Sequence, residues 1–225
     1  MISSVAAITS LAPRPGYRFT EQHWASATVE QQPYAAAKTM SERLSAAECA
    51  RLGIPLSVVN PALVVGPVYT SRQVSASLEL VRALATSRFG GAPPLGYGVI
   101  DVRDVATAAA EALERAATGR FILCAESLWL AEMASLLAAR FPEWKITTRR
   151  LPGLAVWLAA LSVREVPVGY LRSHIGRMDE FDNRRARQLL GLEPRPSADL
   201  ARPAPWRGSR GGSVTPSRGH SLPPR

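Results

Sequence analysis

The stretch PYAAAKTMSERLSAAECARLGIPLSVVNPALVVGP, from Pro33 to Pro67, carries the pattern that decides the fold. A proline in the first turn and Gly53 just past the end predict a helix from about Pro33 to Leu52. The apolar run Leu56–Asn60, closed by Pro61, predicts a short buried strand. A long helix leading directly into a buried strand is typical of α/β proteins.

The same alternation extends toward both ends of the chain. We expect a strand end followed by a small-residue turn in Met1–Ile8, and irregular segments at 12–32 and 89–98. Further strands are expected at Val99–Val102, Arg120–Cys124 and Trp144–Thr148. Helices are expected near 73–87, from Asp104 to Gly119, from Ser127 to about Arg140, over Leu154–Val163, and from Asp182 to Gly191. This order again predicts an α/β class.

Composition excludes several classes of protein. Residues are 47% hydrophobic and 20% charged, which argues against disorder or a fibrous fold for most of the chain. The longest apolar stretch, Leu151–Val163, is shorter than the ~20 residues that a membrane span needs. No basic segment precedes Val5–Leu11, so we expect a cytoplasmic protein without a secretory signal. Two distant cysteines and three histidines exclude a zinc site or a disulfide framework as the basis of the fold.

The positive charge is concentrated at one end. The formal net charge is +9, and residues 201–225 contain five arginines and no acid. This segment is also rich in proline, glycine and serine, so we expect a disordered basic tail. The remaining 200 residues show no basic cluster of the kind that a nucleic-acid surface requires. Nucleic acid is therefore not an expected partner.

Tyr34 and Lys38 form the sharpest chemical signal. Positions four apart on a helix lie one turn above each other, about 40° apart. We expect the core-facing stripe of this helix to be Ala36, Met40, Leu44 and Ala47, which leaves the pair together on another face. An ammonium beside a phenol favours the ionised phenol, so such a pair can exchange a proton with a carbonyl or alcohol oxygen. A surface packing contact explains the same spacing, and the spacing alone leaves both interpretations open.

Two neighbouring segments favour the catalytic interpretation. Ser3-Ser4-Val5-Ala6-Ala7 follows an expected strand end, and its small residues leave room for a ligand beside the Ser4 hydroxyl. Asn60–Pro67 follows the carboxyl end of the strand at Leu56–Asn60. Ligands of open α/β sheets bind at such carboxyl ends.

Five motifs in a fixed order resemble the extended short-chain dehydrogenase/reductases, also called the NAD(P)-dependent epimerase/dehydratase family. They are SSxA, YxxxK, NPxxVxGP, VxDVxDVA and FDNxxAxxLLGxxPR, and the resemblance covers residues 1 to about 200. Asn60–Pro67 and Gly119–Ser127 are most similar to the dihydroflavonol reductase and cinnamoyl-CoA reductase branch. The resemblance implies a partial, Rossmann-like parallel sheet with a small α/β substrate-binding region.

The resemblance also implies roles for particular residues. Tyr34 would be the catalytic acid/base, Lys38 would bind the nicotinamide ribose and favour the ionised phenol, and Ser4 would position the substrate carbonyl. Together they would serve an NAD(P)-dependent oxidoreductase that transfers a hydride to or from a small carbonyl or alcohol substrate.

Further positions follow from the same resemblance. Pro61 and Val64 would line the nicotinamide pocket, and Thr9 would contact substrate. Asp104 matches a recurrent acid of the family, although its place before an alanine-rich run favours a role as helix N-cap. No metal site is implied.

The glycine-rich turn that holds the pyrophosphate in this family has no counterpart in the sequence. We therefore expect residues 1–200 to be the C-terminal part of such a protein, without its nucleotide-binding first half and with impaired activity. The choice between NAD and NADP, the substrate and the capacity to fold alone stay open.

Alternative functions remain. Within the family these are a nucleotide-sugar epimerase or dehydratase and a hydroxysteroid-type dehydrogenase; outside it, a non-catalytic fragment. Family members often pair through the helix that carries YxxxK, so the resemblance also implies a homodimer with Ala35 and Ala46 facing the other chain.

Overall fold

The computed structural model describes residues 1–9, 16–26, 28–30, 32–68, 75–154, 156 and 174–197. Its strands are β1 (Arg18–Phe19), β2 (Ser57–Pro61), β3 (Leu63–Val65), β4 (Gly96–Asp101), β5 (Gly119–Leu123), β6 (Glu126–Trp129) and β7 (Glu180–Phe181). Its helices are η1 (Val5–Ala7), α1 (Pro33–Leu52), α2 (Ala76–Ala85), α3 (Val102–Glu114), α4 (Leu130–Arg140), η2 (Pro142–Trp144) and α7 (Arg184–Leu190).

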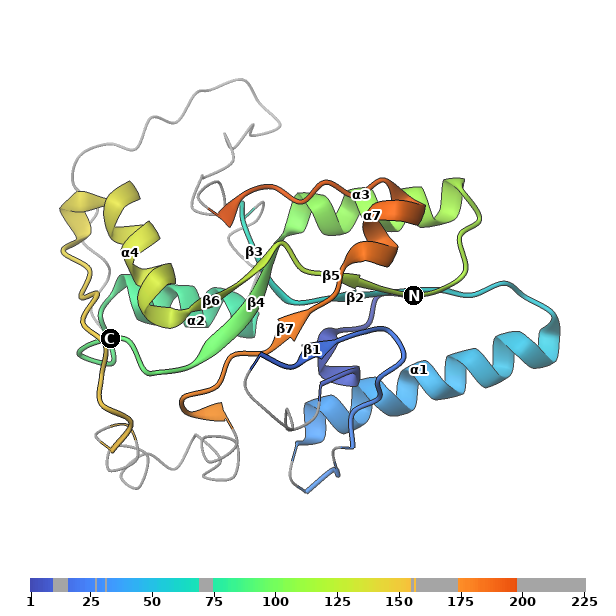
Figure 1. Cartoon of the computed structure of the whole chain (residues 1–225), viewed down its shortest axis with the longest axis horizontal. Helices are drawn as coiled ribbons and strands as arrows, with labels where there is room; N and C mark the ends of the chain where they lie inside the picture. Colours follow the sequence, from blue (N-terminus) through green and yellow to red (C-terminus); the bar gives the residue numbers. More distant parts are fainter. Residues whose placement is uncertain are drawn as a thin grey trace.

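The central strands β2 and β5 run parallel, with Val59 opposite Phe121. Ile2 adds an isolated parallel bridge to Val59, and the Ser3 N–H donates to the Val59 carbonyl at 2.8 Å. Figure 1 shows α1 on one side of this pair and α3 and α7 on the other. The serine segment and the start of α1 are thereby brought to the same part of the molecule.

A three-stranded and a two-stranded sheet complete the described part. β3 pairs in parallel with β4, which pairs in antiparallel with β6. β1 pairs in parallel with β7, so that Phe19 and Phe181 are partners although far apart in sequence. The α/β class with parallel strand pairs predicted from the sequence is confirmed.

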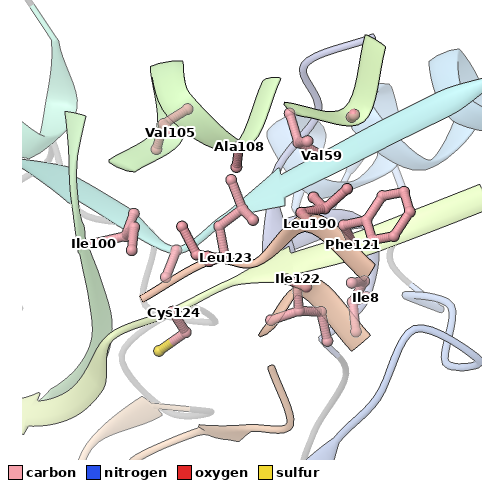
Figure 2. Packing of buried hydrophobic residues seen from close by; sticks show 14 of the residues in the cluster. Ile8, Val59, Ile100, Val105, Ala108, Phe121, Ile122, Leu123, Cys124 and Leu190 are labelled. Carbon is pink, nitrogen blue, oxygen red and sulfur yellow. The ribbon is translucent and has the colours of Figure 1, made fainter. Parts of the chain in front are cut away.

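The core is built where strands are covered on both faces. Val58 and Val59 of β2 and Phe121, Ile122 and Leu123 of β5 are all buried, as expected for parallel strands between helical layers. Figure 2 shows these strands packing with Val105 and Ala108 of α3 and Leu190 of α7. A second cluster joins β4 to α2 and α4 and includes Val99, Leu84, Leu130, Ala134 and Leu137.

Helix α1 has the predicted bounds, and Gly53 ends it in the left-handed conformation with φ of 68°. The predicted core stripe of this helix is right for Ala36 but wrong for the others, because Met40 and Leu44 are 56% and 68% exposed and Ala47 is exposed as well. The buried residues of α1 are Ala35, Ala36, Thr39 and Glu42. Small side chains allow η1 to approach this face closely, and Glu42 is buried because it has a charged partner. Ala35 is therefore covered within the chain itself.

Three other segments differ from expectation. β4 begins at Gly96, inside the segment expected to be irregular, because its pairing with β6 starts there. The residues from Ser127 to Trp129 belong to strand β6, and the helix begins only at Leu130. Pro142–Trp144 forms η2, and Lys145–Thr148 forms no strand.

Two predicted segments cannot be compared with the structure. Most of the expected helix Leu154–Val163 and the whole basic tail 201–225 lie outside the described residues. Within the described ranges, no helix combines the length and apolar character that a membrane span requires.

Candidate active site

A cavity of about 680 Å³ opens where the carboxyl end of β2, the η1 segment and the first turn of α1 meet. A volume of this size suits a small organic ligand. Five of the six predicted site residues lie in its wall: Ser4, Thr9, Tyr34, Pro61 and Val64. Lys38 lies one helical turn beyond Tyr34 and is not part of the wall.

Tyr34 and Lys38 keep the predicted relation on α1. Pro33 occupies the first turn, which places Tyr34 at the helix entrance with 61% of its surface exposed. The Lys38 ammonium lies 5.7 Å from the centre of the Tyr34 ring. A cation at this distance over the ring is attracted by its π-electrons. The helix thus presents a phenol at the cavity with a positive charge beside it.

Ser4 lies at the N-cap of η1. Its backbone is extended, and its hydroxyl oxygen accepts a hydrogen bond from the Ala6 N–H at 3.2 Å. The cap holds the Ser4 side chain at the wall of the cavity. Because the hydroxyl hydrogen is not used by this bond, it can be donated to a ligand oxygen.

Ser3 is a site residue that the sequence reasoning did not select. It lines the same cavity and is 5% exposed, and its hydroxyl has no hydrogen-bond partner among the described residues. A buried hydroxyl without a partner is costly unless something binds it. The doubled serine in SSxA was the available signal, but the pattern alone could not say which of the two hydroxyls lacks a partner in the fold.

Pro61 and Val64 lie on either side of the point where β2 ends and β3 begins. The Ala62 N–H donates to the Leu123 carbonyl at 2.9 Å, which fixes the turn between the two strands. Pro61, Ala62, Leu63 and Val64 give this wall an apolar surface. A flat aromatic ring is well suited to such a surface.

The cavity also has polar walls that the sequence reasoning missed. His174 and Asp179, which come late in the sequence, both line it. Burial raises the pKa of the Asp179 carboxyl above its ordinary value, and the nearby charges of His174 and Arg177 only partly oppose this effect. Gly98 on β4 lines the cavity next to Phe181, whose ring occupies the space of a side chain at that position.

The predicted N-cap role of Asp104 is wrong. Asp101 caps α3, with its carboxylate accepting from the Arg103 N–H at 2.7 Å. Asp104 lies in the first turn, buried, and accepts from the Arg195 N–H at 2.8 Å and from the Arg195 guanidinium. The helix begins two residues before Asp104, so this carboxylate binds a distant chain segment and leaves the α3 N-terminus to Asp101.

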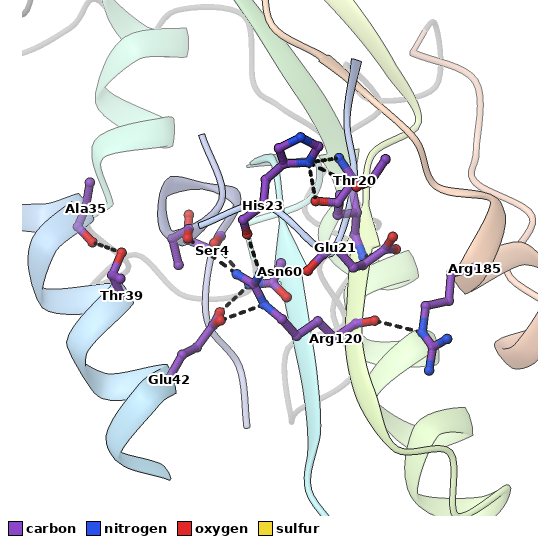
Figure 3. Close-up of polar contacts among 12 residues, drawn as sticks. Ser4, Thr20, Glu21, His23, Ala35, Thr39, Glu42, Asn60, Arg120 and Arg185 are labelled. Atoms are coloured by element: carbon purple, nitrogen blue, oxygen red, sulfur yellow. Dashed lines mark hydrogen bonds and ion pairs between the residues drawn. The ribbon is translucent and has the colours of Figure 1, made fainter. Parts of the chain in front are cut away.

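A buried polar cluster, which we call the Glu42 cluster, consists of Glu42, Asn60 and Arg120 (Figure 3). Their side chains come from α1, β2 and β5. Glu42 pairs with Arg120 at 2.9 Å and accepts a hydrogen bond from the Asn60 side-chain amide. Sequence reasoning missed all three as site residues, because each is an ordinary polar residue until the fold brings them together.

The imidazole ring of the nearby His23 forms hydrogen bonds with residues close to it in sequence. Its Nε2 lies 2.5 Å from the Tyr17 hydroxyl, and its Nδ1 accepts from the Thr20 N–H at 3.0 Å. It is not part of the cavity wall. These contacts stabilise the turn before α1.

Comparison with known families identifies the family of this chain. The model of the NAD dependent epimerase/dehydratase family matches residues 1–124, which is more than half of the chain and includes every predicted site residue. The chain belongs to this family. The resemblance drawn from the five ordered motifs is therefore confirmed.

Curated family members similar to this chain are reductases from plants. Cinnamoyl-CoA reductase 2 of Arabidopsis thaliana is 36% identical over 118 residues, covering 52% of this chain and 35% of that protein. Tetraketide alpha-pyrone reductase 2 of Arabidopsis thaliana is 29% identical over 150 residues, covering 61% of this chain and 46% of that protein. The chain spans about a third to a half of the length of such relatives.

Solved structures of similar fold include a yeast reductase. Yeast methylglyoxal/isovaleraldehyde reductase Gre2, complexed with NADPH, superposes with a TM-score of 0.66 at 24% identity. The match covers 89% of this chain and 60% of that chain. The structure of gox2253 gives a TM-score of 0.69 at 22% identity, covering 89% and 62%. These likenesses establish the Rossmann-like fold of the described part.

Proposed function

We propose that this chain carries the catalytic and substrate-binding portion of an NAD(P)-dependent oxidoreductase that acts on a small carbonyl compound or alcohol. The observation that carries the proposal is the single cavity shared by Ser4, Tyr34, Pro61 and Val64, with the Lys38 ammonium 5.7 Å from the Tyr34 ring. The names of the similar plant proteins, all reductases, support reduction over sugar epimerisation.

The residues present fit the nicotinamide end of the cofactor. The apolar wall from Pro61 to Val64 suits the ring, and the buried Ser3 hydroxyl lacks a partner that a bound group could supply. When bound, the reduced nicotinamide supplies the hydride. We assign no residue of this chain to the pyrophosphate, and the choice between NAD and NADP is left to experiment.

The chain's own residues would handle the proton and the orientation. Ser4 would donate its hydroxyl hydrogen to the substrate oxygen, and Tyr34 would donate a proton to that oxygen as the alcohol forms. Lys38 would favour the phenolate left on Tyr34, because opposite charges attract at close range. Thr9 would contact the remainder of the substrate.

The test uses the purified full chain with NADH or NADPH and a panel of small aldehydes and ketones, followed by the absorbance of the reduced nicotinamide. Tyr34→Phe is expected to lower kcat by about 10²–10⁴-fold, the usual contribution of a positioned proton donor. Lys38→Met is expected to lower kcat and to weaken cofactor binding.

Matched controls are available within the chain. Tyr17→Phe removes the same hydroxyl outside the cavity wall, and Lys145→Met removes the only other lysine of the sequence. Both are expected to retain parental turnover. Absence of nicotinamide oxidation by the parent, or full turnover by Tyr34→Phe, would overturn the proposal.

A further inference from the structure

The Glu42 cluster holds both ends of the segment that carries Ser4. The Asn60 side-chain amide donates to the Ser4 carbonyl at 3.2 Å, where η1 begins. The Arg120 guanidinium donates to the Ala7 carbonyl at 3.4 Å, where η1 ends. Two side chains from the neighbouring strands β2 and β5 therefore form hydrogen bonds with the two ends of η1.

Glu42 joins these two donors to the catalytic helix. It lies one turn beyond Lys38 and two turns beyond Tyr34, and its side chain is 1% exposed. One carboxylate oxygen accepts from Asn60, and the other faces the Arg120 Nε at 2.9 Å. A single buried carboxylate thus connects α1 to Asn60 and Arg120, the two side chains that donate hydrogen bonds to the ends of η1.

Arg120 is itself held in a fixed orientation. It donates to the carbonyls of Glu21 and His23, and its guanidinium lies 4.0 Å from the centre of the Trp24 ring. Arginine is suited to this position because its planar guanidinium can donate to several acceptors at once while it stacks on an aromatic ring. Figure 3 shows the Arg120 guanidinium between Glu42 and the segment around His23.

We propose that Glu42, Asn60 and Arg120 are positioning residues that set the distance between Ser4 and the Tyr34–Lys38 pair. For its catalytic consequence this inference rests on the proposed function. The decisive bond is the one from Asn60 to the Ser4 carbonyl, because it alone connects the cluster to the residue that orients the substrate. None of the three residues lies in the wall of the cavity, so they act through Ser4 and α1.

The test compares two near-isosteric variants. Asn60→Asp removes the amide donor, so Ser4 loses its partner and two carboxylates face each other. In the double variant Asn60→Asp, Glu42→Gln, the glutamine amide can donate to the aspartate at position 60, and the glutamine carbonyl oxygen can still accept from the Arg120 Nε. The double variant restores the charge balance of the cluster while the Ser4 carbonyl still lacks its donor.

Two readouts are measured on the full chain. The first is hydrogen exchange at the amides of Ala7, Ile8 and Thr9, whose bonds to the Ser4 and Val5 carbonyls report on η1. The second is kcat against KM for carbonyl reduction. Urea unfolding gives the global stability of each variant. Thr39→Val is the control, because this buried hydroxyl donates only to the Ala35 carbonyl of its own helix, at 2.8 Å.

We expect the double variant to recover parental stability while exchange in η1 stays about 10-fold faster than in the parent, relative to α3 and α4. We expect kcat to stay lowered by about 10-fold or more, with KM for the cofactor unchanged, because a small misplacement of a catalytic group slows chemistry. Recovery of η1 exchange and kcat together with stability would show a merely structural cluster and overturn the proposal. If the parent reduces no carbonyl, the proposed function fails. The hydrogen-exchange data then decide alone whether the Glu42 cluster positions η1.

Discussion

Arg195 is bound to Asp104 although 91 residues separate them in sequence. The Arg195 N–H donates to one oxygen of the Asp104 carboxylate at 2.8 Å, and the Arg195 guanidinium binds the other. Asp104 is 3% exposed in the first turn of α3. The contact holds the segment after α7 against α3, on the face of the central strands opposite α1 (Figure 1).

Asp104→Asn is expected to lower the free energy of unfolding by about 2–3 kcal/mol, because it removes the buried charge and places an amide N–H opposite one of the two Arg195 donors. Urea unfolding followed by circular dichroism measures the change. Glu48→Gln is the control, since its pair with Arg51 is exposed on both sides and is worth less than about 1 kcal/mol. Equal losses of unfolding free energy in the two variants would contradict a stabilising role for the buried contact between Asp104 and Arg195.

Glu42→Ala is expected to destabilise the chain by about 3–5 kcal/mol, because Arg120 would be left buried without its carboxylate. Burial already lowers the pKa of the Arg120 guanidinium, partly offset by Glu42. In a double-mutant cycle, the variant with both Glu42→Leu and Arg120→Met is expected to lose less stability than the sum of the losses in the Glu42→Leu and Arg120→Met single variants. Strict additivity in this double-mutant cycle would contradict direct pairing.

Asp101 is expected to make the free energy of unfolding depend on pH in the acidic range. Burial raises its pKa, but the hydrogen bonds from the Arg103 side chain and backbone outweigh burial and hold the pKa below its ordinary value. Its contribution is therefore complete above the unfolded value of about 3.9 and is lost as pH falls through the lower, folded value. Urea unfolding between about pH 6 and pH 2 is expected to show a shallower acid loss in Asp101→Asn than in the parent. An identical slope would contradict this contribution.

The two thiols are expected to differ in reactivity. Burial raises the pKa of the Cys124 thiol to about 12, whereas Cys49 is half-buried on α1. Because the thiolate is the reactive form, iodoacetamide at mildly alkaline pH is expected to modify Cys49 in the native chain and Cys124 only after denaturation. Peptide mass spectrometry distinguishes the two sites, and rapid native modification of Cys124 would contradict its burial next to Gly98 of β4.

Gly98→Ala is expected to destabilise the chain by about 1–3 kcal/mol, because overpacking forces neighbours to move. A Cβ at Gly98 would lie 2.8 Å from the Phe181 ring and 2.9 Å from the Cys124 sulfur. Gly153→Ala is the control, since its nearest neighbour would be the flexible Ile175 methyl group at 3.3 Å. Thermal unfolding compares the two, and a larger loss in the control would contradict the packing around Phe181.

Local signals were sufficient for several elements. Pro33 and Gly53 defined both ends of α1, because proline fits the first helical turn and glycine tolerates the positive φ that ends the last. The apolar run before Pro61 located β2 within one residue. Tyr34 and Lys38 could be paired from their spacing, since four residues make about one turn. All of these features depend on residues close together in the chain.

The sequence by itself determined the α/β class, the bounds of α1 and the motifs that mark the family. Only the tertiary structure decided that Met40 and Leu44 are exposed while Glu42 is buried, and that Asp104 binds Arg195 instead of capping α3. Hydrophobic periodicity predicts the opposite for α1, because it cannot represent a charge neutralised by a distant residue. Arg120 supplies that neutralising charge from β5, and only the packing of α1 beside the paired strands brings it within 2.9 Å of Glu42.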